Sequence, residues 1–276
     1  MINKITVVCI AFLMSVATVN GRPYSLSLYN DSSEWDVSDS LMYLPAYDDY
    51  CHWEQSSIWG KRENLTKINK NIQLQLIKDS CQFSSPVIGR VTSKYGWRKG
   101  RPHYGVDVKL QKGDSVASIF EGVVRIAKYS KSYGYVIVVR HANGLESLYA
   151  HLSKLLVRSG DVVDAGTLIG KGGNSGRSFG SHLHLELRYL GEPFNPSEVF
   201  AISDSSFSLK KQELTLNKHS FDLAKKARET RYHRVRSGDS LWRISKKYHV
   251  SIGKLCRLNR MSRKKTLRIG QRIRVN

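Results

Sequence analysis

Cysteine is scarce in this sequence, with four among 276 residues. Cys9 lies in an N-terminal apolar run, so three remain beyond it and no more than one disulfide can form among them. Cys51 and Cys81 could pair in an oxidising compartment. Cys256 lies in an apolar helical pattern, which predicts a buried free thiol.

Long apolar runs are absent beyond the amino terminus. The one long run extends from Ile5 to Val19 after a positively charged start, and small residues at Ala17 and Gly21 allow cleavage after either. This pattern predicts a secretory signal peptide over residues 1–21. An uncleaved anchor is the alternative, but the run is short for a membrane span. Because no later segment is apolar enough to cross a bilayer, we expect a secreted or cell-envelope protein without a stable membrane span.

Acidic residues are few: 23 stand against 44 lysines and arginines, which gives a net charge of +21. Residues 225–276 contain 18 basic and two acidic residues, whereas residues 22–85 are slightly acidic. A basic tail is typical of binding to nucleic acid, a membrane surface or an acidic polymer, or it is a solvated face without a partner. Secretion makes nucleic acid the least favoured of these partners.

Length and a hydrophobic content of 41% indicate a real core and more than one domain. Apolar residues recur with helical spacing between residues 65 and 77, which predicts a helix there. The region around this helix could cover the cleft of the next domain. The predicted parts are a signal peptide (1–21), an N-terminal region (22–85), a β domain (86–200), a polar linker with a short helix near 221–228 (201–230) and a small βααβ domain (231–276).

Short apolar runs separated by turns predict an antiparallel β domain over residues 86–200. Asn143-Gly144 is a strong hairpin signal between two such runs. In the second arm, alternation places Leu148, Ala150 and Leu152 on one face. Ser147, Tyr149 and His151 then share the other face.

The run from His182 to Arg188 alternates polar and apolar residues without a break. In a strand, His182, His184, Glu186 and Arg188 line one face and three leucines pack behind it. Two imidazoles on a rigid strand can contribute to a metal site, although a half-exposed strand with two histidines is the simpler alternative. For Glu186, pairing with Arg188 or solvation is the simplest interpretation.

His103 and Asp107 are candidate partners for this strand. They are four residues apart at the start of another predicted strand, which places both on one face. Together with His184 they would supply three protein ligands and leave a fourth position for water, as in a catalytic zinc site. His151 and His182 would then be free to transfer protons or to stabilise an oxyanion.

Three motifs resemble the lysostaphin-like M23 metallopeptidases, also called LytM domains: His-Tyr-Gly-Val-Asp at 103–107, Tyr-Ala-His-Leu at 149–152 and Gly-Ser-His-Leu-His-Leu-Glu at 180–186. The resemblance covers residues 86–200. It implies antiparallel β-sheets that form a groove, and peptidoglycan peptide bonds as the substrate. It also implies one zinc ion bound by His103, Asp107 and His184, with His151 and His182 as the catalytic histidines.

The carboxyl-terminal region resembles a LysM module, through residues 232–245 and 267–275. A strand, a capped helix start after Gly238, a second helix and a final strand predict a βααβ unit. The resemblance implies binding to N-acetylglucosamine-containing glycan of the cell wall. It places Asp239, Ser240 and Leu241 where the first turn of such modules meets the sugar.

We therefore interpret the chain as a secreted zinc metalloendopeptidase that hydrolyses peptidoglycan and is held on the wall by its LysM module. A non-catalytic or autoinhibited wall-binding protein that activates another hydrolase is the alternative. No departure from the family motif occurs at the five site positions, which favours the enzyme. Glycine bridges, D-Ala–diamino acid cross-links and stem-peptide bonds all remain open as the bond that is cut.

Overall fold

The structure is a computed structural model, and it describes residues 50, 53–77, 82–98, 100–203 and 207–276. The predicted signal peptide and the predicted Cys51–Cys81 pair lie outside the described residues. Cys256 is a buried free thiol, as the sequence predicts. Among the described residues, no helix is both long and apolar enough to span a membrane.

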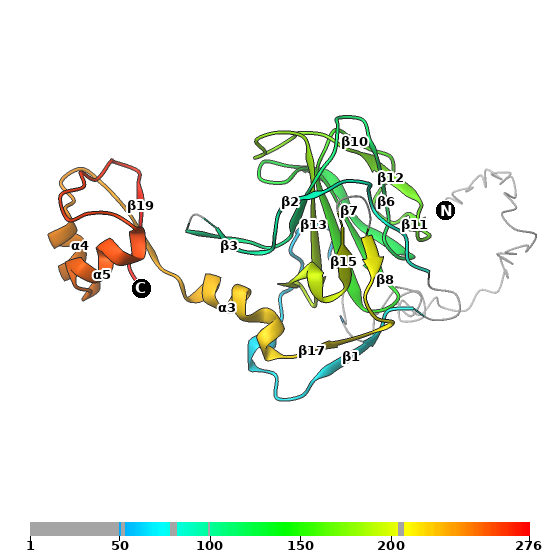
Figure 1. Ribbon diagram of the computed structural model, residues 1–276, viewed down its shortest axis with the longest axis horizontal. Coiled ribbons are helices and arrows are strands. Elements are labelled where there is room, and N and C mark those ends of the chain that lie inside the picture. Colours follow the sequence, from blue (N-terminus) through cyan, green and yellow to red (C-terminus); the bar gives the residue numbers. More distant parts are fainter. Residues whose placement is uncertain (1–49, 51–52, 78–81, 99, 204–206) are drawn as a thin grey trace, which may run out of the picture. The chain divides into compact units, whose positions relative to one another are not determined.

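Antiparallel β-structure dominates the region predicted as a β domain, which confirms the fold class (Figure 1). The strands are β2 (Val91–Ser93), β3 (Gly96–Arg98), β4 (Arg101–His103), β5 (Val106–Lys109), β6 (Ser115–Ala117), β7 (Gly122–Ser130), β8 (Gly134–His141), β9 (Leu145–Leu152), β10 (Lys154–Leu155), β11 (Val162–Val163), β12 (Leu168–Lys171), β13 (His182–Tyr189), β14 (Glu192–Phe194) and β15 (Phe200–Ile202). The largest sheet has the order β11-β7-β8-β9-β13-β5-β2, with β14 beside β13. A second sheet has the order β10-β12-β6, and β3 and β4 form a hairpin.

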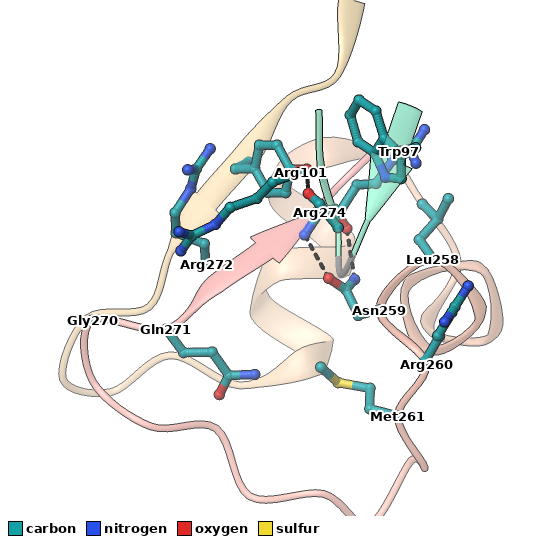
Figure 2. Close-up of a pocket in the computed structure, with 12 residues that line it drawn as sticks. Trp97, Arg101, Leu258, Asn259, Arg260, Met261, Gly270, Gln271, Arg272 and Arg274 are labelled. Atoms are coloured by element: carbon teal, nitrogen blue, oxygen red, sulfur yellow. Dashed lines mark hydrogen bonds between the residues drawn. The ribbon is translucent and has the colours of Figure 1, made fainter. Parts of the chain in front are cut away.

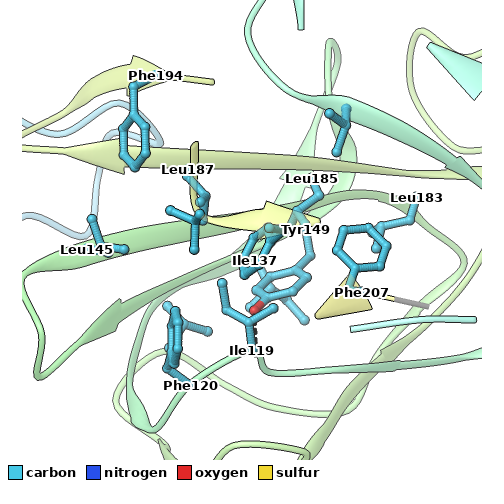
Figure 3. Close-up of a cluster of buried hydrophobic side chains, with 14 of the residues drawn as sticks. Ile119, Phe120, Ile137, Leu145, Tyr149, Leu183, Leu185, Leu187, Phe194 and Phe207 are labelled. Carbon is cyan, nitrogen blue, oxygen red and sulfur yellow. Dashed lines mark hydrogen bonds between the residues drawn. The ribbon is translucent and has the colours of Figure 1, made fainter. Parts of the chain in front are cut away.

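The main core lies on one face of the large sheet, and a smaller apolar cluster that includes Val138 and Leu148 lies on the other. Leu183, Leu185 and Leu187 of β13 are fully buried, and Figure 3 shows them among Tyr149, Phe207 and other apolar side chains of the main core. Burial of one such leucine contributes about 1.5–3 kcal/mol. The alternation of β13 therefore fixes which face carries its histidines, because a shift by one residue would expose all three leucines.

The prediction of a helix between residues 65 and 77 is wrong. Only a short 3-10 helix, η1 (Leu65–Lys67), forms there, and β1 (Ile72–Gln75) follows it. β1 pairs with β17 (Glu213–Leu216), which lies beside it in Figure 1. Leu74 and Leu76 are buried at strand spacing. Pairing with a strand distant in sequence therefore overrides the local helical spacing.

The linker predicted at 201–230 also needs correction. This region contains β16 (Phe207–Leu209), β17, the 3-10 helix η3 (Lys218–Phe221) and α3 (Asp222–Glu229). A further 3-10 helix, η2 (Pro196–Glu198), precedes it. Phe207, Leu216 and Phe221 are buried in the same cluster as β13. The region is thus part of the core of the β domain, although its short helix lies where the sequence predicts one.

The carboxyl-terminal unit has the predicted βααβ order: β18 (Tyr232–Arg234), α4 (Leu241–Tyr248), α5 (Ile252–Asn259) and β19 (Arg272–Arg274). Ser240 and Ser251 cap the two helices by accepting hydrogen bonds from backbone N–H groups. Figure 2 shows the side chain of Asn259 bonded to the backbone of Arg274 in β19. This unit has a separate apolar core that includes Ile244, Leu255 and Ile273.

His141 is a buried structural histidine rather than a site residue. Its Nδ1 donates to the carbonyl of Glu121, and its Nε2 lies 2.7 Å from Ser147 Oγ. Burial lowers the pKa of His141 to about 4. Between this value and about 6.5 the unfolded chain binds a proton that the folded chain does not, so stability falls as the pH falls through this window.

The wild type should lose stability between pH 7.5 and pH 5. We expect this loss to be about 2 kcal/mol smaller in His141→Gln, which has no imidazole to protonate. Urea unfolding at the two pH values measures this difference. The matched control is His219→Gln, at an exposed position that is 72% accessible. Equal pH dependence in wild type and His141→Gln would contradict the assignment.

Candidate metal centre

Strand register brings together the three residues that the sequence predicts as metal ligands. β13 pairs with β5 so that His184 stands directly opposite Asp107, and His103 is the last residue of β4. Asp107 Oδ1 lies 2.9 Å from His103 Nε2 and 2.8 Å from His184 Nδ1. The two imidazole nitrogens are 3.0 Å apart, and all three side chains are buried.

The outer nitrogen of each imidazole has a fixed acceptor. His103 Nδ1 lies 2.8 Å from the carbonyl of Lys94, and His184 Nε2 lies 2.9 Å from Glu186 Oε1. Because a carbonyl and a carboxylate only accept, each of these nitrogens carries the proton. His103 Nε2, His184 Nδ1 and the oxygen of Asp107 therefore converge on one point, an arrangement that needs either shared protons or a cation at its centre. The donor set fits a metal ion with two imidazole and one carboxylate ligand.

The electrostatics of the site also favour positive charge. Burial opposes ionisation of Asp107, but hydrogen bonds from His103 and His184 outweigh it and hold the pKa of this carboxyl well below its usual range. Burial likewise opposes charge on His184, yet its bonds to Asp107 and Glu186 raise its pKa to about 9. An environment that holds a proton this firmly favours a divalent cation in its place.

His151 and His182 lie beside these three residues. The ring centroids of His151 and His182 are 4.8 Å apart, and His182 Nε2 is 3.7 Å from Asp107 Oδ1. His151 Nδ1 donates to the carbonyl of Ser175, and His182 Nδ1 donates to that of Gly180. In the neutral form of each ring, Nε2 then carries no proton. Burial lowers the pKa of His151 to about 4, so this ring is neutral at pH 7.

His151 departs from the strict alternation of β9. Alternation alone would put it on the face of Tyr149, whose ring lies in the core, but the structure holds the φ angle of His151 at 62°. Ala150 and His151 together stand opposite the single Val136, which is a β-bulge. The bulge turns the His151 ring toward His184, so that the centroids of the two rings are 5.9 Å apart. A backbone strained in this way is typical of functional sites.

A close contact between two loops holds His151 in this orientation. The carbonyl of Ser175 accepts a hydrogen bond from His151 Nδ1, and the hydroxyl of Ser175 donates to the carbonyl of Leu152. Gly134 and Gly176 allow this approach: a Cβ on Gly134 would lie 2.1 Å from Ser175 Oγ, and one on Gly176 would lie 2.2 Å from Gly134 N. Both glycines have positive φ angles.

Several charged residues near the site are buried and paired. Of these pairs, the sequence predicts only the one between Glu186 and Arg188. Arg188 Nη2 lies 2.6 Å from Glu186 Oε2, so the predicted pairing is confirmed. A second group joins Glu146 to Arg125 and Arg140. These charged residues alternate with apolar ones along the strands, as solvated residues do. The sequence pattern therefore does not predict that they are buried.

The three predicted glycan-binding residues line a cavity of about 490 Å³ in the βααβ unit. Asp239 accepts hydrogen bonds from His233 Nε2 and the backbone of Arg236, and Ser240 caps α4. Leu241 is largely buried. These residues therefore shape the turn, whereas Trp242, which also lines the cavity, is 60% exposed.

Residues 101–196 match the model of peptidase family M23, and residues 233–276 match that of the LysM domain. The chain carries an M23 peptidase domain and a LysM domain. The four predicted site histidines and Asp107 all lie within the M23 match. The LysM match contains the whole cavity beside Trp242.

Several proteins of known name are similar to part of this chain. The chain is 40% identical over 119 residues to the DD-carboxypeptidase/endopeptidase Mpg of Neisseria meningitidis serogroup B, covering 41% of this chain and 27% of that protein. It is 40% identical over 94 residues to the peptidoglycan DD-endopeptidase ShyA of Vibrio cholerae (34% and 22%). It is 34% identical over 112 residues to the murein hydrolase activator NlpD of Salmonella dublin (40% and 29%). The matches thus span less than a third of these relatives.

Among solved structures, the chain is similar to lysostaphin from Staphylococcus simulans, with 32% identity, 40% of this chain and 48% of that chain covered, and a TM-score of 0.38. It is also similar to a zinc-containing peptidase from Vibrio cholerae, with 29% identity, coverage of 41% and 39%, and a TM-score of 0.39.

Proposed function

We propose that this protein is a zinc-dependent endopeptidase that cleaves peptide bonds of peptidoglycan in the cell envelope. The observation that carries the proposal is the convergence of His103 Nε2, Asp107 Oδ1 and His184 Nδ1, each within 3.0 Å of the other two. The partners of both imidazoles leave lone pairs directed at one point. Zinc bound there would supply Lewis acidity, which makes a water molecule a stronger nucleophile and polarises a carbonyl group.

His151 and His182 are placed to handle protons in this reaction. Both carry the proton on Nδ1, so Nε2 of each can accept a proton from water and return it to the leaving amine. Protonated, either ring could stabilise negative charge on the attacked carbonyl oxygen. Because the pKa of His151 is about 4, its Nε2 is available as an acceptor at neutral pH.

The LysM domain would hold the enzyme on glycan and so raise the concentration of peptide substrate near the M23 domain. Trp242 offers an exposed aromatic face at the cavity that contains Asp239, Ser240 and Leu241. An aromatic ring of this kind can pack against a sugar ring. The relatives named for peptidoglycan support the choice of substrate, and the bond that is cut stays open.

A non-catalytic activator of another hydrolase is the second candidate, and similarity to the activator NlpD favours it. The complete set of three ligands and two further histidines argues for the enzyme. The turbidity of a peptidoglycan suspension, measured after the purified protein is added, distinguishes the two candidates. The enzyme clears the suspension alone, whereas an activator has an effect only after a second hydrolase is added.

Replacement of His151 by alanine should preserve zinc binding and lower the turnover number by about 10²–10⁴-fold, the range for loss of a general acid–base group. The residue lies beside the three ligands without being one of them. Zinc content by atomic absorption and the rate of hydrolysis measure the two effects separately. Loss of zinc in this variant would show that the roles of the histidines are assigned wrongly.

A further inference from the structure

Residues 54–63, here called the strap, are fastened to the large sheet by buried arginines. Arg125 Nη1 donates to the carbonyls of Glu54 (2.7 Å) and Ser57 (2.9 Å). Arg188 Nη1 donates to the carbonyl of Ile58 at 2.8 Å. Arg125 and Arg188 are fully buried, so the strap supplies acceptors that these guanidinium groups need.

Arg188 connects the strap to a metal-site histidine. Its Nε and Nη2 donate to Glu186 Oε2 at 2.9 and 2.6 Å. The other carboxylate oxygen of Glu186 accepts from His184 Nε2 at 2.9 Å and from the hydroxyl of Tyr133 at 3.0 Å. A continuous chain of hydrogen bonds therefore runs from the Ile58 carbonyl through Arg188 and Glu186 to His184.

Trp59 covers this chain of hydrogen bonds. The Arg188 guanidinium lies 3.9 Å from the centre of the Trp59 ring. The centroid of the same ring lies 5.5 Å from that of Tyr104, which it meets edge-on, and 6.3 Å from that of Tyr133. Tyr104 directly follows His103, so Trp59 contacts the chain neighbour of one metal-site residue as well as Arg188. Its position keeps water from the Arg188–Glu186 pair and limits the directions that Arg188 can take.

We propose that the strap is a supporting part of the metal site and that Trp59 is a positioning residue for His184, acting through Arg188 and Glu186. Glu186 keeps the proton on His184 Nε2 and thereby keeps Nδ1 free to bind a metal. This inference rests on the proposed function for the identity of the metal. It differs from the expectation that residues 22–85 cover the cleft, because loosening a cover raises activity and loosening a support weakens metal binding.

Zinc affinity of the full-length protein, measured by competition with a chelator, tests this inference. Trp59→Ala should weaken zinc binding roughly tenfold, the lower end of the range for residues behind a metal ligand. Trp59→Phe should restore most of the affinity, because it retains an aromatic face over Arg188. The matched control is Trp53→Ala: Trp53 also belongs to the N-terminal region but packs 5.0 Å from Arg140, which pairs with Glu146. The control should bind zinc within twofold of wild type.

Unchanged zinc affinity in a folded Trp59→Ala variant would overturn the inference, as would faster hydrolysis at unchanged affinity. If this variant does not fold, Arg188→Lys replaces it, since lysine retains the charge but cannot span Glu186 and Ile58 together. The same loss of affinity is expected, and wild-type affinity in Arg188→Lys would equally overturn the inference. A wild type that binds zinc but hydrolyses nothing would contradict the proposed function alone, because the affinities still test the strap.

Discussion

Replacement of His184 by alanine should abolish zinc binding and reduce hydrolysis by on the order of 10³-fold or more. The change removes one of the three proposed ligands and, at the same time, a hydrogen-bond partner of Glu186. Asp107 and His103 would remain in contact at 2.9 Å, but two protein ligands are too few for a catalytic zinc site. Zinc content after dialysis and the rate of peptidoglycan hydrolysis measure the two losses.

The matched control for this prediction is His219→Ala. His219 is exposed, and among the residues that the structure describes its ring pairs only with the exposed Asp222. This variant should have wild-type zinc content and activity. A folded His184→Ala protein that retains stoichiometric zinc would contradict the assignment of His184 as a ligand.

Replacement of Glu146 by alanine should destabilise the protein by about 3–5 kcal/mol, the cost of leaving buried charges uncompensated. Glu146 is 1% exposed and accepts from Arg125 at 2.6 Å and from Arg140 at 3.0 Å. Burial opposes its ionisation, but the two arginines outweigh this effect and lower its pKa. Its removal leaves two guanidinium groups without their carboxylate.

Thermal unfolding measures this loss, and at roughly 2–4 °C for each kcal/mol the melting temperature should fall by about 10 °C. The control is Glu213→Ala, an exposed glutamate in β17. Its melting temperature should stay within about 2 °C of wild type. Equal melting temperatures for Glu146→Ala and wild type would show that the buried pairs do not stabilise the fold.

The alternation of β13 made the main part of the site predictable. Leu183, Leu185 and Leu187 can be buried in only one register, and this register commits His182 and His184 to the opposite face. His103 and Asp107 also come together, but they lie on separate strands, β4 and β5, so the predicted common face of one strand is wrong. Pairing of β13 with β5 adds the three-dimensional contact that spacing alone cannot give.

Other features depend on contacts between residues that are distant in sequence. His151 reaches the site through a bulge and a positive φ angle, which strict alternation excludes. Arg125 and Arg188 occupy positions that a half-exposed strand would fill with solvated residues. They are buried because the strap supplies carbonyl acceptors, and the strap has no periodic pattern that identifies its role.

Digestion of purified peptidoglycan by the protein tests the central proposal most directly, with the soluble fragments separated by mass with and without a chelator. We expect new fragments that differ by cleavage of a peptide bond, that disappear with chelator and that return when zinc is added back. Their masses would identify the bond. Absence of fragments from a protein that contains stoichiometric zinc would contradict the account of this protein as an endopeptidase.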